Sequence, residues 1–275
     1  MLDLPFTDVA STYEFLAPNL RDRESTEEFE FPVEYMFKDV PKAATDDPVE
    51  HTLALMDHHG IDRAMIGAGS DNQRRALREH PDRFLASIGV DANDGMEALR
   101  QIDRAVETTG LAGVALFPSG CNPPVPINDK RWYPVYAKCV ELDLPVFICV
   151  GVPGPRVPMA AQKVELLDEV CWFFPELRIV MRHGAEPWEE LAVKLMLKWP
   201  NLYYSTSAFA PKYYPQAIVD YANTRGADKV MYAGYFPMGL TLDRIFGELP
   251  DVPLKDEVWP KFLRHNAARV LGLDD

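Results

Sequence analysis

From residue 45 onward, stretches with apolar residues at helical spacing alternate with short apolar runs that carry few charges. Residues 47–60 (DPVEHTLALMDHHG) place apolar side chains on one helix face and stop at Gly60, a residue type that often ends helices. The apolar run IDRAMIGAG follows, then a polar helix over 70–80 and the apolar run FLASIGVD. This alternation is typical of a parallel sheet whose strands are connected by helices.

The rest of the chain repeats this unit. The further predicted strands are LAGVALFP, LPVFICVG, LRIVMRHG, NLYYSTS and DKVMYAGYFP. The further predicted helices cover residues 95–110, 132–143, 159–174, 187–200, 211–224 and 239–248. Pro187 is expected in the first turn of its helix, where a missing N–H costs nothing. With LDLPF at the start counted as strand one, eight strand–helix units favour closure into a (β/α)₈ barrel over an open sheet.

One domain, residues 1–275, accounts for the whole length. A barrel of eight units needs about 250 residues, and the chain has 275. A core of that size is stable by burial alone, without disulfides or a structural metal. The final segment LKDEVWPKFLRHNAARVLGL is predicted as an extra C-terminal helix that packs across the outside or the bottom of the barrel.

A long segment, residues 9–46, separates the first predicted strand from its helix. It contains FEFPVEYMFKDVP, whose aromatic content argues against disorder. In a barrel, the loop after the first strand leaves the C-terminal face, where active sites lie. We therefore predict a lid over the site, with Tyr35 and Lys38 able to reach the substrate; a purely structural extension is the alternative.

Charge and cysteine usage narrow the class of protein. The net charge of −14 argues against nucleic acid and anionic membranes as partners, because both require clusters of Lys and Arg. The N-terminal MLDLPFTDVAS lacks the features of a signal peptide, and no apolar run approaches the roughly 18 residues of a membrane span. Four cysteines without a CxxC pair indicate reduced, mostly buried thiols. We expect a cytoplasmic protein that binds a small-molecule substrate.

Three stretches resemble the amidohydrolase-related family of decarboxylases and hydrolases. LRHNAARVLGL resembles the closing helix of that family, and DKRWYPVYAKCVELDLPVFICVGVPGP resembles its segment from the fourth helix into the fifth strand. IVMRHGAEPWEEL and KVMYAGYFPMG resemble its sixth and eighth strand ends. The resemblance covers nearly the whole chain from residue 47, and it implies the barrel fold and a possible homodimer.

The metal site of the family does not carry over. The family's first strand ends in H-x-H, where this chain has Pro5 and Thr7. Its fifth-strand His corresponds to Cys149, and its eighth-strand Asp corresponds to Tyr235. Only the sixth-strand histidine is retained, as His183. The resemblance implies that this histidine acts on the substrate or on water more than as a metal ligand.

The distribution of histidines leads to the same expectation of no metal and no other cofactor. A catalytic divalent site needs three or more N, O or S ligands at one point. Apart from His183, the histidines fall in or beside helices outside the barrel: 51, 58, 59, 80 and 265. His58 and His59 are adjacent, so we expect them to point to different sides of a helix and not to chelate together.

The barrel brings the remaining chemistry together at the strand ends. The candidates are Thr7, Asp8, Asp91, Cys149, Arg182, His183, Glu186, Ser205, Ser207 and Tyr235, with Arg156 beside them. His183 is the leading general acid–base, since its usual pKa near 6.5 suits proton transfer at neutral pH; a structural histidine is the alternative. Glu186 either orients the imidazole or caps the sixth helix.

The other candidates each have two interpretations. The Tyr235 hydroxyl can donate to an oxyanion, or the ring can simply fill the former metal position. Cys149 is either a nucleophile activated by His183 or a core thiol. Arg156 and Arg182 either clamp a substrate carboxylate or form structural ion pairs. Asp8 and Asp91 are alternative bases or partners of these arginines, and Thr7, Ser205, Tyr35 and Lys38 complete the substrate-binding set.

These features predict a metal-independent enzyme that hydrolyses a small organic acid, lactone or carbonyl compound. A lactonase related to the same superfamily works without a metal, so the loss of ligands is compatible with catalysis. The first alternative is a lyase, a decarboxylase or hydratase, acting on a similar substrate. The second alternative is a pseudoenzyme that binds a ligand without converting it.

Overall fold

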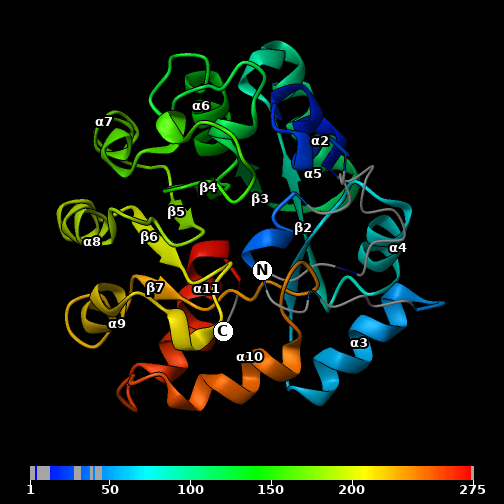
Figure 1. Cartoon of the computed structure of the whole chain (residues 1–275), viewed down its shortest axis with the longest axis vertical. Helices are drawn as coiled ribbons and strands as arrows, with labels where there is room; N and C mark the ends of the chain where they lie inside the picture. The colour runs from blue at the N-terminus through cyan, green and yellow to red at the C-terminus, as the bar shows by residue number, and fades with distance from the viewer. Residues whose placement is uncertain (1–3, 5–12, 28–31, 38–39, 41–44, 274–275) are drawn as a thin grey trace.

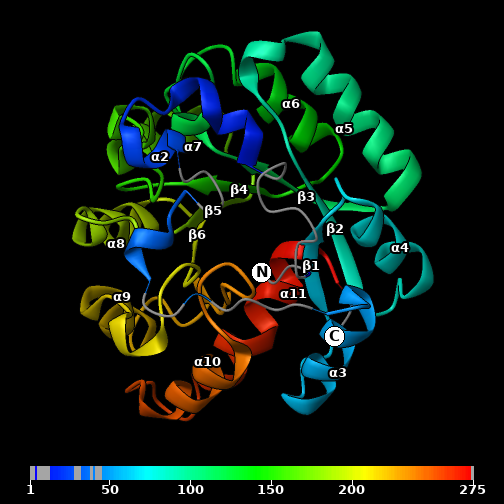
Figure 2. The same cartoon turned by 45° about the vertical axis from the view of Figure 1, so that its right-hand side comes forward.

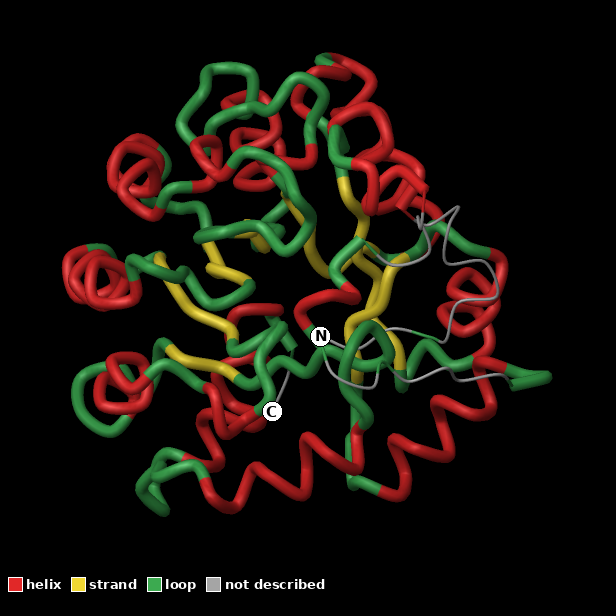
Figure 3. Tube along the Cα trace, viewed as in Figure 1, coloured by secondary structure: helices red, strands yellow, loops and turns green. Residues whose placement is uncertain are grey.

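The computed structural model describes residues 4, 13–27, 32–37, 40 and 45–273. Within these residues, the strands form one parallel sheet in sequential order that curls around a central axis, with helices outside it (Figures 1 and 3). The strands are β1 (Ala64–Gly67), β2 (Phe84–Gly89), β3 (Leu111–Leu116), β4 (Val146–Cys149), β5 (Ile179–Arg182), β6 (Leu202–Ser205) and β7 (Val230–Met231).

These strands confirm predicted strands two to eight, so β4, β5 and β7 are the predicted fifth, sixth and eighth strands. The predicted first strand, LDLPF, lies outside the described residues except for Leu4, which is buried in the main core. The seven described strands, parallel, curled and joined in sequence by helices, have the arrangement of strands in an eight-stranded TIM barrel.

The helices from α3 onward follow from local sequence signals. They are α3 (Pro48–His58), α4 (Asp71–Glu79), α5 (Met96–Thr109), α6 (Tyr133–Glu141), α7 (Leu167–Phe173), α8 (Glu189–Lys198), α9 (Gln216–Ala222), α10 (Leu242–Glu248) and α11 (Asn266–Leu271). The Asp47 side chain caps α3, and a capping box of Ser70 and Gln73 begins α4. Gly110 ends α5 with a left-handed φ of 62°. None of the helices formed by the described residues is long and apolar enough to cross a bilayer.

Three helix predictions need correction. Pro187 does not begin α8: it follows a cis peptide bond after Glu186, and the helix begins at Glu189. The predicted helix over 159–174 is divided by Lys163, whose extended backbone (ψ 135°) leaves α7 as the only α-helical part. The predicted helix over 211–224 is interrupted before Pro215, because a residue that precedes proline avoids helical backbone.

The C-terminal helix closes the bottom of the barrel. Val270 of α11 packs in a buried cluster with Met65, Phe147, Val180 and Met231, which come from strands around the ring. The Asn266 amide, also on α11, donates to the carbonyl oxygens of Ala227 (2.8 Å) and Val230 (2.7 Å), where β7 begins. In Figures 1 and 2, α11 accordingly lies within the ring of strands. The N-terminal end of the barrel therefore has an apolar floor.

A polar layer lies above this floor. Successive side chains of a strand point to opposite faces, so the residue two positions after an inward-facing one also faces inward. Two positions beyond Phe147 and Val180 are Cys149 and Arg182, which are paired neighbours in the β4–β5 ladder. Two positions beyond Tyr203, which packs against the floor, is Ser205. The alternation thus places the candidate chemistry at the C-terminal strand ends.

The floor yields a stability prediction. Phe147→Ala removes a buried ring from the contact between the sheet and α11, and we expect it to lower the free energy of unfolding by about 3–5 kcal/mol. Met96→Ala is the control, because this side chain on α5 is 62% exposed; it should change stability by less than about 0.5 kcal/mol. Urea unfolding at matched pH measures both, and equal stability of the two variants would show that the floor does not hold the barrel together.

Candidate functional site

The polar layer brings together several of the predicted site residues. Cys149 ends β4, Arg182 ends β5, and His183 follows directly after Arg182. Ser207 lies two residues after β6, and its hydroxyl oxygen is 3.2 Å from Nδ1 of His183. Tyr235 follows β7, and its ring packs edge-on against the His183 imidazole with 5.6 Å between centroids. Four adjacent strand ends thus contribute to one cluster, which we call the Arg182 cluster: Cys149, Arg182, His183, Ser207 and Tyr235.

An unusual turn holds His183 in place. His183, Gly184 and Ala185 have positive φ angles of 64°, 92° and 63°. Residues with a β-carbon adopt this region at a cost of order 1 kcal/mol or more, and such backbone is concentrated at functional sites. The backbone N–H of His183 donates to the Ser207 hydroxyl (3.2 Å), and the Tyr204 hydroxyl donates to the Gly184 carbonyl oxygen (3.0 Å). The surrounding strands therefore stabilise the turn and fix the direction of the imidazole.

The protonation states in the cluster follow from burial and from Arg182. Burial lowers the pKa of His183 well below its usual value of 6.5, and the positive charge of Arg182 lowers it further. Burial raises the pKa of Tyr235 to about 12, although Arg182 opposes the increase. Burial also raises the pKa of Cys149, again against the effect of Arg182. At neutral pH, an arginine cation therefore adjoins a neutral imidazole, a phenol and a thiol, and the protonated thiol is a poor nucleophile.

The segment before α3 packs over the C-terminal ends of the strands. Phe37 stacks on Tyr235 with 5.6 Å between ring centroids and an interplanar angle of 21°. At the start of the segment, Leu16 and Leu20 pack against Val157 in the loop that follows β4. The described parts of the predicted lid include the short helices η1 (Glu14–Asn19), α2 (Arg23–Glu27) and η2 (Glu34–Met36).

Arg156 and Tyr35 connect this segment to the same loop. The Arg156 guanidinium forms 2.8 Å ion pairs with Asp22 and Glu24, and it lies 4.5 Å from the centre of the Tyr35 ring. The Tyr35 hydroxyl donates to the Gly154 carbonyl oxygen at 2.6 Å. Hydrogen bonds from Ser25, together with Arg156, lower the pKa of Asp22 to about 2. Both predicted substrate-binding residues are thus engaged in holding the segment against the barrel.

Three further predicted site residues have different surroundings. The Asp91 carboxylate accepts a hydrogen bond from the Asn93 N–H at 2.8 Å, in the turn after β2. The Ser205 hydroxyl is buried and donates to the Met181 carbonyl oxygen at 3.1 Å. Glu186 is exposed. The predicted residues Thr7, Asp8 and Lys38, together with Pro5, lie outside the described residues.

Sequence reasoning did not identify the residues that support the turn. Tyr204 donates the hydrogen bond to Gly184, and the Phe209 ring lies where a β-carbon on Gly184 would stand, at 2.3 Å. Both are aromatic residues in or after a buried strand, and such residues are ordinarily read as core packing. A left-handed turn after β5 gives no signal in the hydrophobic pattern, so nothing in the sequence distinguished them.

The donor atoms in the described part of the cluster do not fit a catalytic divalent metal. Cys149 and His183 are its only side chains of the types that usually bind transition metals, and the Arg182 cation adjoins both. Among the described residues, convergent groups of three or more His, Cys, Asp or Glu ligands are limited to one outside the cluster: His58, His59 and Asp243.

That group corrects a sequence expectation. His58 and His59 were expected to point to different sides of a helix, but α3 ends at His58 and His59 leaves helical backbone (φ −96°, ψ 4°). The ligand atoms of both histidines and of Asp243 consequently lie within 4.8 Å of one another. Two adjacent residues point to different sides only if both are helical. Because His59 is not helical, the two imidazoles can face the same space.

Comparison with known proteins identifies the family. The amidohydrolase family profile matches residues 15–273. A TIM-barrel protein from Bordetella bronchiseptica superposes with a TM-score of 0.75 at 23% identity, covering 98% of this chain and 96% of that one. The 5-carboxyvanillate decarboxylase from Novosphingobium aromaticivorans, solved with manganese, superposes with a TM-score of 0.71 at 18% identity, covering 99% and 94%. At these identities, the two structures establish the fold alone.

One relative is similar in sequence. A 2-keto-4-carboxy-3-hexenedioate hydratase from Sphingobium sp. (strain NBRC 103272 / SYK-6) is 30% identical over 106 residues, which are 34% of this chain and 31% of the hydratase. The match thus spans less than a third of that relative. The family profile, by contrast, extends over nearly the whole chain, from the segment before α3 to α11. The chain therefore belongs to the amidohydrolase family and has the TIM-barrel fold of its enzymes.

Proposed function

We propose that this protein is a lyase that adds water to, or removes water from, a small carboxylic acid. The observation that carries the proposal is the combination of a cation and neutral proton-transfer groups in the Arg182 cluster. Hydrolysis was the leading expectation from the sequence, with a lyase as the alternative. The similar proteins are a hydratase and a decarboxylase, which favours the lyase.

Arg182 is proposed to bind the substrate carboxylate. Its guanidinium has the forked geometry that pairs with a carboxylate through two hydrogen bonds. It influences the pKa of Cys149, His183 and Tyr235, so it lies near all three groups. Because these three groups are uncharged at neutral pH, they do not compete with the substrate for the positive charge.

His183 is proposed to move the proton. Its lowered pKa keeps the imidazole neutral, so it can accept a proton from the carbon next to the substrate carbonyl. Ser207 is 3.2 Å from Nδ1, which leaves Nε2 as the nitrogen that exchanges the proton. The protonated Tyr235 hydroxyl donates to the enolate oxygen that forms. The hydroxyl group on the carbon β to this carbonyl then takes the proton back from His183 and leaves as water. The histidine thus returns to its neutral form.

The role of Arg182 separates hydration from decarboxylation. A guanidinium that pairs with a carboxylate stabilises it as an anion, whereas decarboxylation requires that this group lose its charge and leave as CO₂. An interaction stronger in the ground state than in the transition state slows the reaction. A carboxylate held by Arg182 is therefore better suited to remain intact while the neighbouring carbons react, as in a hydration.

The test uses a panel of small γ-hydroxy-α-keto acids, whose hydroxyl group is β to the keto group, with the conjugated product followed by its ultraviolet absorbance. His183→Gln should reduce kcat by roughly 10²–10⁴ with a much smaller change in KM, as expected for a lost proton-transfer group. Arg182→Met should instead raise KM by about 10–150-fold, the value of a charge-assisted hydrogen bond. His51→Gln, on the outer helix α3, is the matched control and should keep full activity.

Other outcomes of this assay contradict parts of the proposal. Release of CO₂ without a conjugated product identifies a decarboxylase, and cleavage of lactones or esters alone returns the chain to the hydrolases. Binding of the acids without turnover identifies the pseudoenzyme. Full activity of a folded His183→Gln protein removes this residue from the chemistry.

The neutral His183 also predicts how stability depends on pH. The unfolded chain protonates this histidine near pH 6.5, while the folded state resists protonation, so the unfolded state binds more protons below that pH. Its contribution to stability is complete above about pH 6.5 and is lost as the pH falls, by at most about 1.4 kcal/mol per pH unit. Urea unfolding between pH 5 and 7 should show this slope in the parent and His51→Gln proteins but not in His183→Gln. Parallel curves for all three would contradict a neutral His183 in the folded state.

The proposed reaction proceeds without a divalent metal, because the described donors of the Arg182 cluster do not form a metal site. Dialysis against a strong chelator is therefore expected to leave kcat and KM unchanged. Loss of activity that manganese or zinc restores would contradict this expectation.

A further inference from the structure

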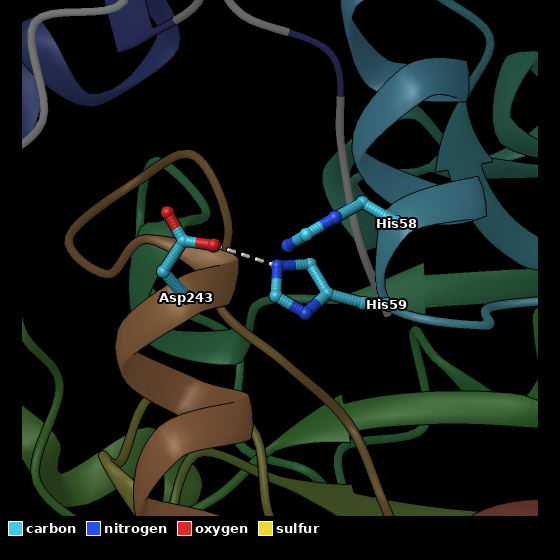
Figure 4. A group of neighbouring side chains, drawn as sticks. All are labelled: His58, His59 and Asp243. Atoms are coloured by element: carbon cyan, nitrogen blue, oxygen red, sulfur yellow. Dashed lines mark hydrogen bonds and ion pairs between the residues drawn. The ribbon is translucent and has the colours of Figure 1, made fainter.

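Two histidines and a carboxylate converge where α3 and α10 meet. His58 is the last residue of α3, His59 follows it, and Asp243 lies in the first turn of α10. Nε2 of His59 is 2.9 Å from Oδ1 of Asp243, and one ligand atom from each residue lies within 4.8 Å of the other two. Figure 4 shows a ring nitrogen of His58 directed toward the same space.

The surroundings hold one ligand in place and leave the others accessible. The His59 ring stacks on Phe246 with 4.8 Å between centroids and an interplanar angle of 15°, and its side chain is only 10% exposed. The His58 ring meets the His59 ring edge-on at 4.7 Å. The Asp243 side chain is 74% exposed, so an ion can enter from solvent.

We propose that His58, His59 and Asp243 bind a divalent transition metal ion, with zinc as the best match. Two imidazole nitrogens and one carboxylate oxygen are a common zinc ligand set, and water can occupy the fourth tetrahedral position. Magnesium and calcium are disfavoured because they prefer oxygen ligands throughout. The present separations of up to 4.8 Å close to those of a tetrahedral site by rotation of the two exposed side chains.

The hydrogen bond between His59 and Asp243 means that metal binding must displace a proton. In the metal-free protein, Nε2 of His59 donates a hydrogen bond to the Asp243 carboxylate. A metal ion needs the Nε2 lone pair, so the proton either moves to Nδ1 of the same ring or is released to solvent. Metal binding at this site therefore competes with a proton, as it does for imidazole ligands in general.

The position of the site indicates a structural role. α3 precedes β1 and α10 follows β7, and these two strands are not paired with each other among the described residues. The His59–Asp243 contact joins residues that are 184 positions apart in the chain. A metal ion bound here links the first and last described strand–helix units and holds the barrel closed at the seam between them.

Calorimetric titration of the chelator-treated protein with zinc chloride tests the site. One equivalent should bind, and binding should be at least about tenfold weaker in Asp243→Asn and in His58→Gln, since even indirect partners of metal ligands contribute this much. Both side chains are exposed, so neither change should impair folding. At a 100-fold excess of free zinc over Kd, the Tm of the parent protein should rise by roughly 5 °C.

Two control variants identify where the ion binds. His80→Gln alters another histidine near a carboxylate, 3.9 Å from Glu50, and should bind zinc as the parent does. His183→Gln should also bind zinc normally, which separates this site from the Arg182 cluster and from the proposed reaction. Zinc binding that survives Asp243→Asn and His58→Gln unchanged, or that is lost in His183→Gln, overturns the proposal, as does the absence of any binding.

Discussion

The alternation of side chains along the parallel strands determines where this barrel can have a reactive site. One set of inward positions, including Phe147 and Val180, is apolar and packs on α11. The next inward positions on the same strands are Cys149 and Arg182. The apolar positions pack against α11 at the N-terminal end of the barrel. This contact fixes the position of each strand, and it therefore places Cys149 and Arg182 at the C-terminal end.

The charge of Arg182 then organises the chemistry of that layer. Its guanidinium and the burial of the strand ends act together on His183, because both disfavour the imidazolium. They act in opposite directions on Tyr235, where burial prevails and keeps the hydroxyl protonated. One fixed cation thus leaves both a proton acceptor and a proton donor in their neutral forms, which is the state that general acid–base catalysis on an anionic substrate needs.

The barrel architecture could be predicted from the sequence because the repeated pattern of buried strand and amphipathic helix involves many residues. A misleading signal at one residue does not change such a pattern. Strands β1–β7 and the position of His183 at the end of β5 followed from it. The local errors arose where a helix begins or ends, as at the start of α8 at Glu189 and at the end of α3 between His58 and His59. The partners of Arg156 were not predictable, because they come from a segment more than 130 residues away that carries no periodic pattern.

The left-handed turn at residues 183–185 also limits how this site can change over evolutionary time. A β-carbon at Gly184 would stand 2.3 Å from the Phe209 ring, and the backbone there already has a φ of 92° that only glycine adopts easily. Any other residue at position 184 would therefore clash with Phe209, so Phe209 would have to be replaced by a smaller residue first. Neighbouring positions of the cluster face no such barrier. Homologues can therefore be expected to exchange the reactive groups around the turn, and so their substrates, while the turn itself is inherited unchanged.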